Sequence, residues 1–140
     1  MRSDAERRTA APGESPTVQE SSREPPVVTL AQSCQGLLAP HGFWLERYGS
    51  SLGLNWVRFR RVLRDSAMGV CTQVFLVAHD RESQQFLADD YLVQDRLLLD
   101  EADRHAAWSY ADVDELPAVM QAVCRTLQEW ATLPPRIPGS

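Results

Sequence analysis

The chain has 140 residues, of which 44% are hydrophobic and 24% charged, and its formal net charge is −5. This length and composition are typical of one ordinary globular domain, and the mild negative charge argues against a general binder of polyanions. No apolar run approaches the ~20 residues that a membrane span needs, and no apolar segment follows the N-terminal arginines as in a secretory signal peptide. All 14 basic residues are arginines, a bias that indicates a GC-rich bacterial genome. We therefore expect a cytoplasmic bacterial protein without membrane contacts.

The three cysteines give a first indication of the redox environment. Cys34, Cys71 and Cys124 are an odd number, lie far apart and each have apolar neighbours. Buried free thiols in a reducing cytoplasm are the simplest interpretation of this pattern.

Residues 1–26 are predicted to form a disordered tail. They contain four prolines, many polar residues and almost no large apolar side chain, so they cannot bury enough surface to offset the entropy of ordering. A single domain is then expected over residues 27–140.

The first predicted helix follows this tail, with Thr29 as its N-cap. One helical face is formed by apolar residues at i, i+4, i+7 and i+8: Leu30, Cys34, Leu37 and Leu38. Pro40 ends the helix. An extended segment is expected over residues 43–45, and residues 49–53 are expected to form a flexible connection.

Three strand signals follow in the chain. Residues 54–63 alternate between two faces, with Trp56, Arg58 and Arg60 opposite an apolar set. Residues 70–78 are continuously apolar, as in a central strand. Residues 84–99 fit either a strand or a helix; we favour a strand over 85–94, followed by an irregular acidic stretch.

The C-terminal helix has the clearest pattern. Asp112 or Asp114 can cap it, and capping at Asp114 places Pro117 in the first turn, where a missing N–H costs little. Seven residues form one apolar stripe: Leu116, Val119, Met120, Val123, Cys124, Leu127 and Trp130. The predicted fold class is α+β, with a three- to four-stranded, mostly antiparallel sheet packed by an N-terminal and a C-terminal helix.

Arginine and acid are segregated along the chain. Residues 47–64 carry five arginines and no acidic residue, whereas residues 80–115 carry eleven Asp and Glu against three Arg. The row of Trp56, Arg58 and Arg60 has the side chains that stack bases and hold phosphates. The simpler alternative is that these arginines are neutralised inside the fold by carboxylates of the acidic segment: Asp89, Asp90 or Asp95. In that case we expect no nucleic-acid binding.

Catalytic and metal-binding patterns are weak. His79 and His105 have carboxylates nearby in the chain and can form acid–base pairs, but no nucleophile and no second Cys or His stands at motif spacing. The acidic cluster Asp100, Glu101 and Asp103 lacks the glycine and the closing glutamate of a calcium loop. We therefore predict no catalytic residue, no metal site and no cofactor, and expect this cluster to be a solvated loop.

Trp108 and Tyr110 alternate beside the acidic stretch, as in a short edge strand. They fit either burial in the core or an exposed aromatic anchor of a protein interface, where such residues are enriched. Both interpretations stay open at the level of the sequence, and core burial is the simpler one.

The order of these motifs resembles known small domains. Leu37-Leu38 and His41-Gly42-Phe43 precede the strands, and Trp108-Ser109-Tyr110 runs into Asp114-Glu115-Leu116 and the last helix. Over about residues 30–133 this resembles small uncharacterised bacterial α+β domains that begin with a helix and Gly-Phe and end strand-to-helix. The outline is also similar to secretion-chaperone-like domains, whose helices pack against a short antiparallel sheet. The resemblance implies this fold and supplies no catalytic residues.

We expect a non-enzymatic, immunity- or chaperone-like module that binds another protein through the acidic and aromatic residues of 80–115. A basic partner is the best electrostatic match. One alternative is a small enzyme or anionic-ligand-binding domain that uses His79, His105, Arg58 and Arg60. A second alternative is nucleic-acid binding through Trp56 and the same two arginines.

Overall fold

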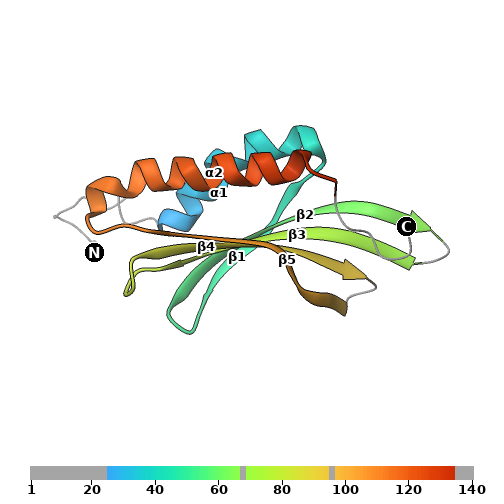
Figure 1. The fold of residues 1–140 in the computed structure, drawn as a ribbon, viewed down its shortest axis with the longest axis horizontal. Helices are drawn as coiled ribbons and strands as arrows, with labels where there is room; N and C mark the ends of the chain where they lie inside the picture. Colours follow the sequence, from blue (N-terminus) through green and yellow to red (C-terminus); the bar gives the residue numbers. More distant parts are fainter. Residues whose placement is uncertain (1–24, 67–68, 95–96, 135–140) are drawn as a thin grey trace, which may run out of the picture.

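The computed structural model describes residues 25–66, 69–94 and 97–134, without the side chains of residues 64–66 and 97–103. Within these ranges the chain forms two helices and a five-stranded antiparallel sheet (Figure 1). The elements are α1 (Pro26–Leu38), η2 (Ala39–His41), β1 (Trp44–Ser51), β2 (Leu54–Ser66), β3 (Gly69–Asp80), β4 (Gln85–Gln94), β5 (Leu97–Ser109), η3 (Val113–Glu115) and α2 (Leu116–Thr132). The α+β class is confirmed, but the sheet has five strands where three or four were expected. Residues 1–24 of the predicted tail lie outside the described residues, so its disorder stays a prediction.

The sheet is a simple meander in which each strand pairs with the next one in the chain. Residues 49–51, expected to be part of a flexible connection, belong to β1, and the turn to β2 is only Leu52 and Gly53. Both turn residues have positive φ, at 54° and 81°, as in the two-residue turns whose twist matches an antiparallel hairpin. The tight turn therefore extends the paired region into polar residues that the sequence pattern had assigned to a loop.

The predicted strand over residues 85–94 is confirmed as β4, but the acidic stretch after it is not irregular. Residues 97–109 form β5, which pairs with β4 from Gln85↔Ser109 to Gln94↔Leu97, with one bulge between Asp90 and Leu92. Backbone pairing with β4 outweighs the low strand propensity of Asp and Glu, and charged residues are tolerated on an edge strand. Trp108 lies in this long edge strand, and Tyr110 follows it directly.

Both helices lie side by side on one face of the sheet (Figure 1). The predicted apolar stripes face the sheet, and the core is completed by Phe59, Phe75 and Phe86 from three strands. Two details of α1 differ from expectation. Thr29 is inside the helix rather than its N-cap, because Pro25 and Pro26 supply the preset backbone of the first turn. Leu37 is 38% exposed.

The start of the last helix agrees only in part with the sequence pattern. The Asp112 carboxylate accepts a hydrogen bond from the Asp114 backbone N–H and so starts the short helix η3. The helix α2 follows from Leu116, with Pro117 in its first turn. Asp112 therefore caps η3, whereas the N-cap of α2 itself is Glu115, which makes no side-chain capping hydrogen bond.

The expectation of three free thiols is wrong for two of the cysteines. Cys34 of α1 and Cys124 of α2 form a disulfide, with their Cα atoms 5.4 Å apart, and Cys71 is free and buried. The 90-residue separation of the pair in the sequence hides this contact. Only the side-by-side packing of the two helices brings these sulfur atoms together.

Candidate functional site

The sheet presents one face to the helices and leaves the other face open. Val57, Phe59, Phe75 and Val77 belong to the core under the helices, and successive residues of a strand point to opposite faces. The face opposite the helices carries the alternate residues, and no described helix packs on it (Figure 1). We call this surface the open face; from β1 to β5 it includes Glu46, Arg47, Trp56, Arg58, Arg60, Val74, Leu76, Ala78, Leu87, Asp89, Tyr91, His105 and Ala107.

The β1–β2 side of the open face carries the predicted aromatic–guanidinium row. The guanidinium groups of Arg47 and Arg58 lie 5.8 and 5.6 Å from the centre of the Trp56 ring, within the range of cation–π attraction. Glu46 accepts hydrogen bonds from Arg58 Nε at 2.8 Å and from Arg60 Nε at 2.9 Å. A β-bulge between Leu45 and Arg47 accompanies this placement of Glu46.

The neutralising carboxylate is therefore not the one that the sequence suggested. Asp89 and Asp90 pair with other groups, and Asp95 lies outside the described residues. Glu46 serves Arg58 and Arg60 instead, because pairing in the β1–β2 hairpin places it between them. The signal that could have found it is a lone acidic residue one short hairpin away from the arginine row.

The β4–β5 side of the open face carries the carboxylate of Asp89. Asp89 Oδ1 lies 2.6 Å from His105 Nδ1, and the His105 side chain is 58% exposed. Burial, and secondarily the charge of Asp89, raise the pKa of Tyr91. Asp100, Glu101 and Asp103 lie on β5 rather than in a loop, and their side chains are outside the described part of the structure.

Under the helices, the sheet holds a buried polar network that the sequence analysis missed. Gln73 donates from Nε2 to both Asp90 oxygens, at 2.9 and 3.1 Å, and Arg104 Nη1 donates to Asp90 Oδ2 at 2.7 Å. Arg61 donates to Gln73 Oε1, to the His41 carbonyl and to the Ala131 carbonyl at 3.3 Å. Burial lowers the pKa of Arg61, and Asp90 opposes that shift.

This network joins the helices to the sheet. Both backbone carbonyls that Arg61 reaches lie near the ends of helical segments, where a cation is favoured by the helix dipole. Its guanidinium also lies 4.6 Å from the centre of the Phe43 ring. The hydrogen bonds of Gln73 and Arg61 link the sheet to the ends of the helical segments, which supports a structural role. The polar residues Gln73 and Asp90 within otherwise apolar strands were the available signal.

The two histidines of the predicted acid–base alternative do not form one site. His79 is 1% exposed, stacks on Phe86 and lies with Nε2 2.7 Å from the Tyr110 hydroxyl. Burial lowers its pKa, and its Nδ1 atom has no hydrogen-bond partner among the described residues. His79 faces the helices and His105 the open face, so the sheet separates them. Tyr110 is buried, and Trp108 is partly buried against the core.

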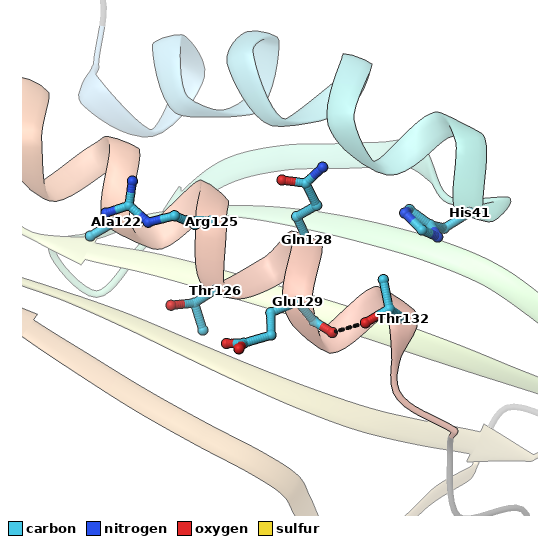
Figure 2. Close-up of a pocket in the computed structure, with 7 residues that line it drawn as sticks. All are labelled: His41, Ala122, Arg125, Thr126, Gln128, Glu129 and Thr132. Carbon is cyan, nitrogen blue, oxygen red and sulfur yellow. Dashed lines mark hydrogen bonds between the residues drawn. The ribbon is translucent and has the colours of Figure 1, made fainter.

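A surface depression lies elsewhere, on the outer side of the helices (Figure 2). It encloses about 490 Å³ between His41 and α2. Figure 2 shows Arg125 and Gln128 pointing away from Thr126 and Glu129, so these polar groups do not converge on one point. The hydrogen bond drawn there, from Thr132 Oγ1 to the Glu129 carbonyl at 2.7 Å, is internal to the helix. We find no catalytic arrangement in this depression.

Neither a metal site nor a similar protein points to another function for the described part of the chain. In the described ranges, no three His, Cys, Asp or Glu side chains gather closely enough to hold a metal ion. None of the helices seen here has the length and apolar character to cross a membrane. No protein-family model, no curated protein and no solved structure matches this chain. The open face therefore has to be interpreted from its own residues.

Proposed function

We propose that this protein is a non-enzymatic binding module that contacts another protein through the open face of its sheet. The observation that carries the proposal is an apolar centre between oppositely charged sides. Leu76, Ala78 and Leu87 lie in the middle of the face, partly exposed. The arginine side and the Asp89 side flank them. An apolar centre with a charged rim is the usual composition of protein interfaces.

The proposed contact surface differs in part from the one expected from the sequence, which was residues 80–115. On the open face the acidic segment contributes Asp89, Tyr91 and His105, and β2 contributes Trp56, whereas Tyr110 is buried under the helices. Tryptophan and arginine are the residue types that most often dominate binding energy at interfaces. The cation–π contacts of Arg47 and Arg58 with Trp56 restrict these three side chains. Side chains that are already ordered lose less entropy on binding.

The nucleic-acid alternative uses the same arginines. The salt dependence of the binding affinity distinguishes it from protein binding. A protein that neutralises phosphates loses affinity steeply as salt rises, by about 0.7 to 0.9 in log K per phosphate and per log unit of salt. Glu46 offsets part of the positive charge of Arg58 and Arg60, and the net charge of the whole chain is −5, so we expect no binding of single-stranded DNA or RNA at moderate salt. Micromolar binding that disappears in Arg58→Ala/Arg60→Ala would favour the nucleic-acid function instead.

Site-specific photo-cross-linking inside cells that express the protein tests the proposal. A photoreactive amino acid at Ala78 samples the centre of the open face, and the same group at Gln121, exposed on the outer side of α2, is the matched control. We expect discrete protein adducts from position 78 and none from position 121. Equal adduct patterns, or none from position 78, would contradict binding through the open face.

A further inference from the structure

The open face has an ordered charge pattern from one side to the other. Strand pairing aligns Arg47 with Arg58, Arg58 with Leu76, Leu76 with Asp89, and Asp89 with His105. This row of five side chains crosses all five strands and is basic at one end, apolar in the centre and acidic beyond it. Side chains of paired residues lie on the same face of a sheet, so the row is a continuous surface feature.

The two neighbouring rows are ordered in a similar way. On one side Trp56 pairs with Ala78, Ala78 with Leu87, and Leu87 with Ala107. This row therefore changes from a large side chain on β2 to small and medium ones on β3, β4 and β5. On the other side, Arg60 pairs with Val74 and Val74 with Tyr91. In both rows the groups on β2 and β4 are chemically different.

A two-fold rotation makes this pattern complementary to itself. An axis parallel to β3, placed above the open face, exchanges the β1–β2 side with the β4–β5 side and keeps each row at its own level. Arg58 then lies over Asp89 of the second copy, Trp56 over Leu87 and Arg60 over Tyr91. An axis across the strands would instead place arginine over arginine. Self-complementary patches of this kind are required of two-fold dimers.

We propose that the occupant of the open face is a second copy of this chain, packed sheet to sheet about a two-fold axis along β3. The inference rests on the proposed function, because it names the partner of the same surface. Two sheets in such an arrangement lie about 10 Å apart, with their strands about 30° from parallel. Both charge pairs between Arg58 and Asp89 would lie near the centre of the interface, on either side of Leu76.

The groups required for these contacts are present. Arg58 uses Nε for Glu46, and Asp89 uses Oδ1 for His105. The described contacts leave the terminal nitrogens of Arg58 and Oδ2 of Asp89 for the second copy.

Five strands spaced at about 4.8 Å and about eight residues long cover roughly 600 Å² per copy. This is near the lower end of specific interfaces, so we expect a dimer that dissociates in the micromolar range.

Charge reversal with mixing tests the register. In Arg58→Glu alone two carboxylates would face each other across the axis, and in Asp89→Arg alone two guanidinium groups would do so. We expect each variant to dimerise at least about tenfold more weakly than the wild-type protein. An equimolar mixture should regain the wild-type dimer, because each introduced charge then faces an opposite one in the other chain. Sedimentation velocity from about 1 to about 500 µM measures all four samples.

Matched controls are available away from the open face. Arg125→Glu on α2 and Glu82→Arg in the β3–β4 turn reverse the same charges at exposed positions and should leave dimerisation unchanged. Circular dichroism and thermal unfolding confirm that each variant is folded. A wild-type protein that is monomeric throughout, or a mixture no more dimeric than its components, would overturn the inference. Adducts to a different protein from position 78 would then still uphold the open face as a binding surface, whereas their absence would remove both proposals.

Discussion

The disulfide between Cys34 and Cys124 gives the largest expected stability effect. Reducing it leaves the native contacts in place but removes a restraint on the unfolded chain. For a separation of 90 residues, the chain-entropy relation gives about 4.6 kcal/mol at 25 °C. A domain of this size has a total stability of only about 5–15 kcal/mol. Reduction should therefore remove a large share of the stability.

Urea denaturation with and without a phosphine reductant measures this effect. A Cys34→Ala/Cys124→Ala variant is the control, since its unfolding midpoint should not respond to reductant. Thiol titration of the urea-unfolded, unreduced protein should detect one cysteine, Cys71. Three titratable thiols, or a loss below about 1 kcal/mol on reduction, would refute the argument.

Three further predictions concern stability. Leu127 is completely buried, so Leu127→Ala should lower the free energy of unfolding, measured in urea, by about 2–5 kcal/mol. Leu133→Ala at the exposed helix end should lower it by less than about 0.5 kcal/mol, and similar losses at both sites would contradict the packing. Burial lowers the pKa of His79 below 6.5 in the folded state, so the unfolded chain binds its proton first and stability should fall as pH drops below that value; His79→Gln should reduce this slope, and an unchanged slope would be evidence against it. Removal of residues 1–24 should leave the melting temperature within about 2 °C, and a loss of several degrees would show that the tail supports the fold.

The sequence predicts the parts of the fold that depend on local periodicity. The stripe that ends at Leu127 and Trp130 is apolar at helical spacing, and the alternation of residues 54–63 separates Val57 from Trp56. Both patterns reappear in the structure as α2 and the two faces of β2. The strand β5 could not be predicted in this way, because its acidic residues follow no apolar alternation and its pairing with β4 is a tertiary effect.

The candidate site was predicted only in part. Trp56, Arg58 and Arg60 do share one face, as their alternation indicated. Their partner Glu46 depends on the hairpin register and on a bulge in β1, neither of which single-sequence periodicity can supply. The position of Tyr110 depends on a hydrogen bond with His79, 31 residues away in the chain. Contacts between distant residues thus decide which aromatic side chains can face a partner.

The central claim is that a second copy of the chain packs on the open face, and hydroxyl-radical footprinting at increasing protein concentration tests it most directly. Trp56 and Tyr91 lie on this face, whereas Tyr48 is 54% exposed and lies on the other face of β1. We predict that oxidation of Trp56 and Tyr91 falls as concentration rises while that of Tyr48 stays constant. Oxidation rates of Trp56 and Tyr91 that stay constant across the concentration range would contradict packing of a second copy on the open face.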